Sequence, residues 1–336
     1  MTAGRRLPHL LVGLACCVCV IAADATSSGA AGDLQRVESS DEAMGTTFSV
    51  VLYGSDRPTL EAAAAAAFNE VHRLDRLLSN YQPASEWSAV NRSAALRPVK
   101  VSPELFDLLS ACFRYSRQSD GAFDITVGPL MKVWGFYKGE GLLPRKAEVA
   151  RALSRVGYRH VTLDSAHQTV HFDRAGVELD PGGIGKGYAV DRMVDVLKRR
   201  GVRAALISGG GSSIYALGAP PEEAKGWRVT IGVPGDPHRT AAELFLKDAS
   251  LSTSGSYEKF FWAEGRTYSH LMDPRTGYPA QGTASVSVLA PRTIDSEAWA
   301  KPYFVNGRAW TAAHVVSDQR VFFCEDAKPV ACGWVN

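Results

Sequence analysis

Helical and strand-like patterns follow one another along this 336-residue chain without a repeating strand–helix–strand unit. Apolar residues recur at helical spacing over Pro58–Leu78, where a run of alanines allows close packing. Ser102 and Pro103 are residue types that begin helices, and the alternation over Gly45–Tyr53 is that of a strand. Because helices and strands are mixed in an irregular order, the sequence predicts an α+β fold of mixed sheets with packed helices.

The stretch Tyr81–Ala94 has no periodicity and contains Pro83 and Asn91, so we expect a loop there. Elsewhere the same reasoning gives approximate boundaries for each element. The expected helices are 58–78, 103–118, 145–156, 187–200 and 296–304, and the expected strands are 45–53, 160–163, 169–172, 204–208, 227–233, 284–290 and 321–324.

The composition supports one folded body. The chain is 46% hydrophobic and 21% charged, which is enough apolar material for a sizeable core. No linker or charge run divides it beyond its N-terminal part, so residues 39–336 are expected to form one domain. Residues 26–38 are rich in Ser, Ala and Gly and are expected to be a flexible tether.

The N-terminus has the pattern of an export signal. Arg5 and Arg6 precede the apolar run Leu7–Ala23, and small residues around Asp24 offer a cleavage site, so residues 1–25 are expected to be a signal peptide. A membrane anchor is the alternative, although about 20 apolar residues are needed to span a bilayer. Lipid attachment at Cys16 is a second alternative. In each case the body is expected outside the cytoplasm, either periplasmic or membrane-anchored and facing the periplasm.

Half of the six cysteines lie inside this N-terminal segment. In an oxidising compartment, Cys324 and Cys332 could close a short C-terminal loop as a disulfide. The alternative is a reduced pair in adjacent strands. Cys112 falls on the apolar face of an expected helix. The formal net charge of +2 is spread without a basic patch or interleaved aromatics, so no nucleic-acid partner is expected.

The densest glycine segment, Asp180–Tyr188, stands directly before an expected helix. Glycines let a backbone approach a phosphate closely, and a helix N-terminus favours negative charge. The segment matches neither the P-loop nor the dinucleotide-binding pattern, because Lys186 is followed by Gly187. A tight turn between strand and helix is an equally good interpretation, and the same holds for Gly209–Ser213.

Two further segments combine polar groups with turn residues. Asp124 stands in the otherwise apolar stretch Gly121–Gly128, which we expect to be a strand, and an acid there needs a partner. That partner could be a ligand, or Asp124 could cap the following turn. Ser252–Tyr257 and Tyr268–Gly277 bring hydroxyl groups and His270 into a short span, which favours a catalytic role for this histidine.

Taken in order, these motifs resemble the ApbE family of FAD:protein FMN transferases. The resemblance runs from Ala43–Phe48 to Ala290-Pro291, which is nearly all of the chain beyond its N-terminal segment. Segments between these ends include Trp134–Phe136 and Asp180–Asp191. Each motif has low specificity, but several of them in one order are highly specific together.

The resemblance implies a role for individual residues. His270 matches the residue that deprotonates the acceptor threonine, and FAD is the expected substrate. The residues expected to bind FAD are Met44 and Tyr81 at the flavin, Ala122, Phe123 and Asp124 along a strand edge, Gly182, Lys186 and Tyr188 beside the diphosphate, and Met272 near the adenine or ribose.

The resemblance also implies a magnesium ion that bridges the diphosphate and neutralises charge on the leaving AMP. Gly185, Glu297 and Ala300 are the expected metal-binding residues. Here the chain departs from the family, which has Asp and then Thr at the positions of Glu297 and Lys301. An ammonium has donors and no acceptor. Because residues four apart share a helix face, we expect Lys301 to point toward the metal locus and to pair with Glu297.

The leading hypothesis is therefore an exported enzyme that attaches FMN from FAD to a Thr or Ser of a partner flavoprotein and releases AMP. His270 would be the general base, with Asp295 as the next candidate. An FAD pyrophosphatase, in which water replaces the acceptor hydroxyl, is one alternative. An FAD-binding or storage protein without turnover is the other, because Lys301 departs from the family pattern.

Overall fold

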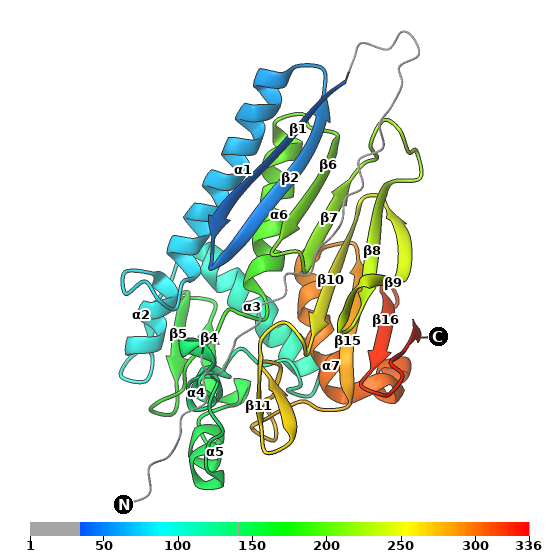
Figure 1. Ribbon diagram of the computed structural model, residues 1–336. Coiled ribbons are helices and arrows are strands. Elements are labelled where there is room, and N and C mark those ends of the chain that lie inside the picture. Colours follow the sequence, from blue (N-terminus) through cyan, green and yellow to red (C-terminus); the bar gives the residue numbers. More distant parts are fainter. Residues whose placement is uncertain (1–33, 140, 336) are drawn as a thin grey trace, which may run out of the picture.

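The computed structural model describes residues 34–139 and 141–335, and the fold is α+β, as expected (Figure 1). Its main sheet has eight strands in the order β1-β2-β6-β7-β10-β15-β16-β17, and all neighbouring pairs are antiparallel. The strands are β1 Gln35–Ala43, β2 Thr46–Gly54, β6 Ala204–Gly209, β7 Ser213–Leu217, β10 Ala249–Gly255, β15 Thr283–Ala290, β16 Arg320–Glu325 and β17 Ala331–Trp334.

Three long helices cover one face of this sheet: α1 Arg57–Leu78, α6 Gly185–Arg199 and α7 Thr293–His314, the last with a kink at Gly307, whose backbone is not helical. The helices α1 and α6 pack together over β1, β2, β6 and β7, and α7 packs on β10 and β15. The hairpin of β8 Trp227–Val233 and β9 Asp236–Leu246 packs on the opposite face through a separate apolar cluster. The sheet therefore has an apolar layer on both sides.

A smaller group of elements packs at one end of the long helices (Figure 1). Most of their apolar side chains join those of α7 and β15 in one core cluster, whereas those of residues 128–133 and 146–153 belong to a separate cluster around Trp134. They are the helices α2 Glu86–Ser93, α3 Pro103–Gln118, α4 Gly128–Val133 and α5 Lys146–Leu153, and the strands β3 Val99–Lys100, β4 Val161–Asp164 and β5 Thr169–Phe172. Two short strand pairs follow in the chain, β11 Phe260–Ala263 with β12 Arg266–Ser269, and β13 Met272–Asp273 with β14 Tyr278–Pro279.

The expected loop over residues 81–94 is wrong, because α2 occupies most of it. Ser85 caps this helix by accepting a hydrogen bond from the backbone N–H of Ser88. Trp87 is fully buried, and its Nε1–H donates to the carbonyl of Leu179 at 3.0 Å. A helix this short has too few apolar positions to show a period, so tertiary contacts decide its conformation.

The N-terminal boundaries also differ from expectation in one respect. The expected signal peptide, residues 1–25, lies outside the described residues. The expected tether, 26–38, overlaps β1, which begins at Gln35 and pairs with β2 along its whole length. The strand β1 was not expected, because its side chains are mostly polar and only Val37 and Ala43 are buried.

The two C-terminal cysteines form a disulfide. Cys324 of β16 and Cys332 of β17 are direct partners across the two strands, and they are bonded. This confirms the expected pairing. Cys112 is free and fully buried in α3, as its place on the apolar face of the helix predicted.

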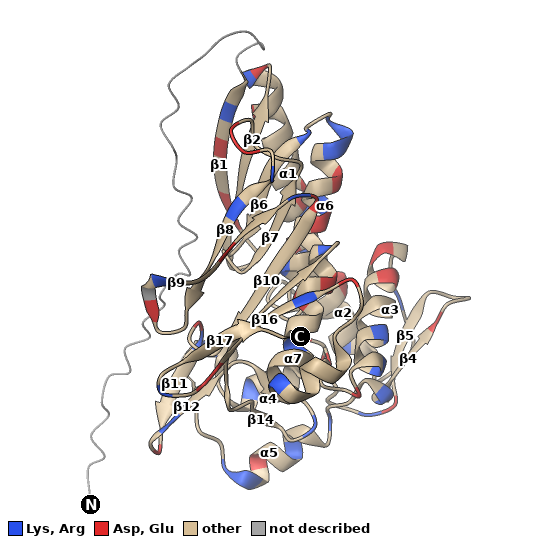
Figure 2. Cartoon of the chain, turned by 90° about the vertical axis from the view of Figure 1, so that its right-hand side faces the viewer, with Lys and Arg blue, Asp and Glu red and all other residues tan. Residues whose placement is uncertain are grey.

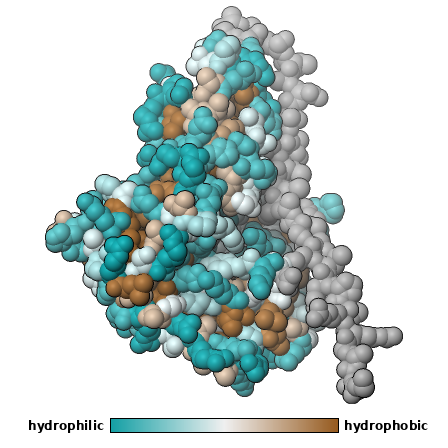
Figure 3. All heavy atoms as spheres, turned by 90° about the vertical axis from the view of Figure 1, so that its left-hand side faces the viewer, coloured by the Kyte–Doolittle hydropathy of each residue, from teal (hydrophilic) through white to brown (hydrophobic). Residues whose placement is uncertain are grey.

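The outer surface is mixed in charge and polarity. Figure 2 shows Lys and Arg interspersed with Asp and Glu along the elements. On the face drawn in Figure 3, apolar atoms form separate groups among hydrophilic ones. Within the described ranges, we find no helix with the length and apolar character needed to cross a bilayer.

Candidate functional site

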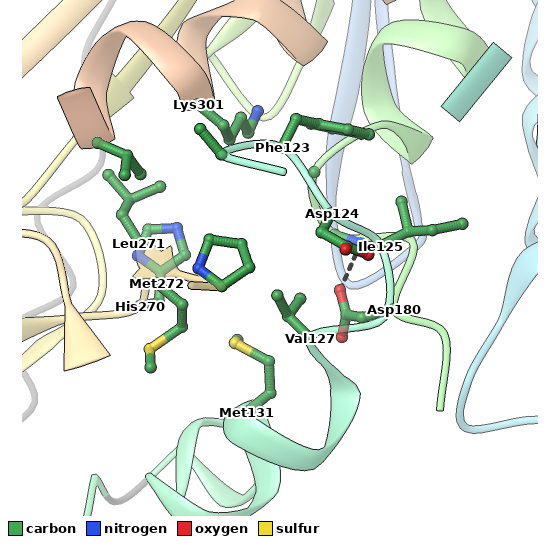
Figure 4. A pocket seen from close by; sticks show the side chains of 15 residues that line it. Phe123, Asp124, Ile125, Val127, Met131, Asp180, His270, Leu271, Met272 and Lys301 are labelled. Carbon is green, nitrogen blue, oxygen red and sulfur yellow. Dashed lines mark hydrogen bonds between the residues drawn. The ribbon is translucent and has the colours of Figure 1, made fainter. Parts of the chain in front are cut away.

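A pocket of about 650 Å³, counting the space at its open mouth, lies between the start of α6, the turn before α4 and the segment after β12 (Figure 4). His270 and Met272 lie on one side of it, and Asp124 and Asp180 on the other. The residues that line it are Ala122, Phe123, Asp124, Ile125, Val127, Met131, Asp180, Gly182, Gly183, His270, Leu271, Met272, Pro274, Lys301 and Val305.

Asp124 belongs to a turn between α3 and α4, so the expected strand at residues 121–128 is wrong. One carboxylate oxygen accepts from the backbone N–H and the hydroxyl of Thr126, at 2.8 and 2.7 Å. The other oxygen accepts from the backbone N–H of Tyr158 at 2.6 Å. Burial raises the pKa of Asp124, while these donors oppose the shift. The sequence left two roles open for Asp124, binding a ligand or capping the following turn. Its observed contacts are those of a turn cap.

Asp180 holds the segment that leads into α6. Its carboxylate accepts from the backbone N–H of Gly182 at 2.7 Å, from the hydroxyl of Tyr137 at 2.5 Å and from Nδ2 of Asn80 at 3.4 Å. Burial raises the pKa of Asp180 and also that of Tyr137. These bonds fix the backbone at Gly182 and Gly183, which forms part of the pocket wall.

His270 directly follows β12 and lines the pocket. Its Nδ1 lies 3.2 Å from the carbonyl oxygen of Lys259, which can only accept, so Nδ1 carries the proton in this contact and Nε2 is left unprotonated. Burial and the positive charges of Lys186 and Lys259 lower the pKa of His270 to about 3. The ring is therefore neutral at physiological pH and can accept a proton at Nε2.

Glu297 joins α7 to the beginning of α6. It is 1% exposed, and its Oε2 accepts a hydrogen bond from the backbone N–H of Gly187. A Cβ at position 187 would lie 2.5 Å from the carbonyl oxygen of Thr293 and 2.8 Å from Oε2 of Glu297. Gly187 therefore allows α6 and α7 to pack closely. This glycine of the segment Asp180–Tyr188 has a role in helix packing.

Two ammonium groups flank the other oxygen of this carboxylate. Oε1 of Glu297 lies 3.7 Å from Nζ of Lys301 and 4.0 Å from Nζ of Lys186. Lys301 also donates to the backbone carbonyl of Glu297 at 2.9 Å. Burial lowers the pKa of Lys301 to about 8, with Lys186 adding to the shift and Glu297 opposing it. The expected pairing of Lys301 with Glu297 is confirmed.

A protein-family model described as the ApbE family matches residues 44–322. The chain belongs to the ApbE family. An FAD:protein FMN transferase of Treponema pallidum is 32% identical over 310 residues, which cover 88% of this chain and 84% of that protein. Another, from Klebsiella pneumoniae, is 30% identical over 312 residues, which cover 91% of this chain and 88% of that protein.

Solved structures of ApbE proteins have the same fold. The ApbE protein of Thermotoga maritima has a TM-score of 0.81 at 28% identity, and the match covers 90% of this chain and 97% of that chain. The flavinyl transferase ApbE of Pseudomonas stutzeri has a TM-score of 0.80 at 27% identity, with 90% and 95% of the chains covered.

The side chains at the expected metal locus of this ApbE family member do not fit a magnesium ion. Oε2 of Glu297 is already bonded to Gly187, and Lys301 offers a donor where a ligand would need an acceptor. A cation on Oε1 would be close to two ammonium groups, and two like unit charges 4 Å apart repel by roughly 4 kcal/mol at an effective dielectric constant of about 20. Among the described residues, no group of three or more His, Cys, Asp or Glu side chains could hold a metal ion.

The pocket brings together only part of the set that the family resemblance implied. Lys186 is linked to it through Glu297 and Lys301. Met44 lies in the turn between β1 and β2 and packs near Gly185. A Cβ added at Gly185 would lie 3.2 Å from Cε of Met44. The expected residues that line the pocket are Ala122, Phe123, Asp124, Gly182, His270 and Met272.

Four expected residues have other surroundings. Tyr81 is 73% exposed and meets Tyr137 edge-to-face, with ring centroids 6.1 Å apart. The hydroxyl of Tyr188 donates to Oε1 of Glu104 at 2.9 Å. Ala300 is fully buried in the core cluster of α7. Asp295, the second candidate for the base, accepts a hydrogen bond from Tyr115 and does not line the pocket.

Sequence reasoning missed several residues of this region. Tyr137 orients Asp180, and Met131 of α4 forms part of the pocket wall. Glu258 is half-buried near the ammonium groups of Lys186 and Lys301, and burial raises its pKa while those charges oppose the shift. Glu258 directly follows the segment Ser252–Tyr257, so extending that motif by one residue would have included it.

Proposed function

We propose that this chain transfers FMN from FAD to a hydroxyl group of a Thr or Ser on a partner flavoprotein and releases AMP. The observation that carries the proposal is the neutral His270 in the same pocket as Lys301 and the Gly182–Gly183 backbone. This arrangement supports a site that combines a base with a phosphate-binding region. The FAD:protein FMN transferases among its relatives support the same reaction.

In the proposed reaction, the acceptor oxygen forms a bond to the phosphorus of the FMN half of FAD. The bond from this phosphorus to the bridging oxygen breaks, and that oxygen leaves with AMP. Nε2 of His270 takes the proton of the acceptor hydroxyl, because Nδ1–H is directed to the carbonyl of Lys259. Lys259 thereby sets the tautomer that can act as a base.

The proposed position of FAD follows the chemistry of the pocket walls. Phe123, Ile125 and Met272 contribute apolar surface on different walls of the pocket, which suits the adenine end of FAD. The diphosphate would lie at Gly182 and Lys301. The flavin ring would lie toward Met44 and the exposed ring of Tyr81.

Mass spectrometry of an acceptor tests this function directly. The protein is incubated with FAD and a peptide that carries a candidate acceptor threonine, with and without magnesium, and the peptide is weighed. We expect a mass increase equal to one phosphoester-linked FMN, together with one AMP released for each modified peptide. AMP and free FMN with an unmodified peptide would support the pyrophosphatase alternative. FAD binding without AMP release would support the storage alternative.

We also propose that the enzyme acts after export. The sequence pattern of residues 1–25 and the disulfide between Cys324 and Cys332 both favour an oxidising compartment. Cell fractionation, followed by mass measurement of the cysteines after alkylation without a reductant, tests this. Recovery of the chain in the cytoplasm with both thiols alkylated would contradict it.

A further inference from the structure

Two buried carboxylate oxygens near Lys301 lack a hydrogen-bond partner. Oε1 of Glu297 and Oε1 of Glu258 are both inaccessible, and neither accepts a hydrogen bond. Glu297 comes from α7, Glu258 from the segment between β10 and β11, and Lys186 from α6. We call Lys186, Glu258, Glu297 and Lys301 the open charge cluster.

The ammonium groups of the open charge cluster also have N–H donors that make no hydrogen bond. An ammonium carries three donors, and Lys301 uses one of them on the carbonyl of Glu297. Nζ of Lys186 makes no hydrogen bond to any residue in the described ranges, and the carboxylate oxygen with which it pairs, Oε1 of Glu297, is 4.0 Å away. The charge of Lys259 is also close enough to act on Glu258 and His270. Three ammonium groups thus stand against two carboxylates.

Lys301 is positioned beside the proposed phosphate-binding backbone. A Cβ at Gly183 would lie 3.7 Å from Cε of Lys301, so the lysine side chain runs along this part of the pocket wall. Figure 4 shows Lys301 next to Phe123, at the end of the pocket away from Met131. The ammonium is therefore held by Glu297 at a point where an anion on Gly182–Gly183 would meet it.

We propose that Lys186 and Lys301 together bind the FAD diphosphate in place of a divalent cation, so that neither binding nor transfer by this chain requires a metal ion. This inference rests on the proposed function, because it takes FAD as the ligand. The phosphate oxygens accept the donors that the cluster leaves free, and Glu297, whose Oε1 lies 3.7 Å from Nζ of Lys301 and 4.0 Å from Nζ of Lys186, holds the two ammonium groups on one carboxylate. The same positive charges stabilise the negative charge that develops on the departing AMP.

Binding of FAD in the absence of metal tests this inference. The FAD dissociation constant of the full chain is measured from fluorescence quenching in EDTA and again in excess magnesium. We expect values that agree within about twofold, because the ammonium groups supply the charge that a cation would otherwise provide. Binding that occurs only with magnesium would overturn the inference and leave the proposed function standing. Absence of binding under both conditions would overturn both.

Variants identify the groups responsible. Lys301→Met should weaken FAD binding about 10- to 100-fold in both conditions, as expected for loss of a charged hydrogen-bond donor. The double variant Glu297→Asp, Lys301→Thr restores the family pattern and should bind FAD at least about tenfold more tightly with magnesium than with EDTA. Lys146→Met removes one exposed positive charge from α5 and serves as the control, with wild-type affinity expected.

Release of AMP gives a second measurement. With an acceptor peptide, the wild-type chain should release AMP in EDTA at a rate within about threefold of the rate in magnesium. Circular dichroism confirms that each variant is folded. If Lys301→Met fails to fold, the metal dependence of FAD binding by the wild type and by the double variant still tests the inference. Equal metal dependence of the wild type and the double variant would overturn the inference.

Discussion

Two clusters of charged residues contact helix α6, and they differ in how completely their members are paired. The first joins α1, α3 and α6, and we call it the paired charge cluster. Arg73 donates to both oxygens of Glu70 and both oxygens of Glu104 at 2.7 to 2.8 Å. Tyr188 and Arg192 of α6 donate to the same carboxylates, at 2.9 and 3.2 Å.

The open charge cluster lies at the other side of the start of α6 and has the opposite character. It leaves one oxygen of Glu258 and one of Glu297 without a hydrogen bond. Its ammonium groups keep hydrogen-bond donors that no described residue accepts, and these donors, rather than the carboxylate oxygens, can bond to an anion. The paired charge cluster therefore holds helices together, whereas the open charge cluster keeps donors free for the proposed ligand.

The largest effect is expected at the base beside the open charge cluster. His270→Ala should lower the transfer rate about 100- to 10,000-fold, because the acceptor hydroxyl loses the group that takes its proton. FAD affinity should stay within about twofold, since the base acts on the acceptor and not on the cofactor. AMP release and fluorescence quenching measure the two quantities. A variant that keeps most of its rate would remove His270 from the mechanism.

A smaller effect is expected at Gly187, whose backbone N–H bonds to Glu297 of the open charge cluster. In Gly187→Ala, the new methyl group would meet the carbonyl of Thr293 and Oε2 of Glu297, so α6 and α7 must separate. Overpacking of this kind lowers the free energy of unfolding by about 1–3 kcal/mol. Urea denaturation measures this loss, and FAD affinity should fall as well because Glu297 is displaced. Gly201→Ala is the control: its φ of +78° makes an alanine strained there, so stability should fall as well, but no atom lies near its Cβ and FAD affinity should stay unchanged.

A substitution in the paired charge cluster should lower the free energy of unfolding without changing FAD affinity. Glu104→Gln keeps the size of the side chain but removes a charge that Arg73 and Tyr188 use. Because Arg73 keeps Glu70 and the cluster is partly exposed, the free energy of unfolding should fall by only about 1 kcal/mol. FAD affinity is expected to stay within about twofold. A large loss of FAD affinity would show that this cluster also serves the ligand, as the expected role of Tyr188 implied.

Much of the fold could be predicted from the sequence, because long elements carry a strong period. Helix α1 has buried residues at helical spacing from Leu60 to Leu78, and Ser102 caps α3 as its residue type predicts. Short elements could not be predicted, because their conformation depends on partners that are distant in the sequence. Helix α2 is stabilised by Trp87 on the carbonyl of Leu179, which is 92 positions away.

The candidate site was predictable to the extent that its motifs are local. His270 and Gly182 were identified from segments that do line the pocket. The pairing of Glu297 with Lys301 followed from their spacing of four residues on one helix. The convergence of Glu258 on the same lysines could not be foreseen, because it depends on a segment from another part of the chain packing against α6 and α7.

The smallest expected effect is in the pH dependence of transfer. Burial and the charges of Lys186 and Lys259 lower the pKa of His270 from 6.5 to about 3. The neutral ring is the form that accepts a proton, and a lowered pKa keeps that form populated as the pH falls. Between pH 7.5 and 5, kcat/KM should therefore change by less than about twofold through this residue, since kcat/KM reports the base of the free enzyme.

An unshifted histidine gives a different result, because a pKa of 6.5 would lower kcat/KM roughly 30-fold between pH 7.5 and 5. Lys259→Met offers a matched test, since it removes one charge that lowers the pKa and keeps the backbone carbonyl that orients Nδ1. In this variant the acid limb of the profile should move to higher pH. A wild-type acid limb centred near 6.5 would place His270 in an ordinary aqueous environment, and the positive charges of the open charge cluster would then lie too far from the ring to act on it.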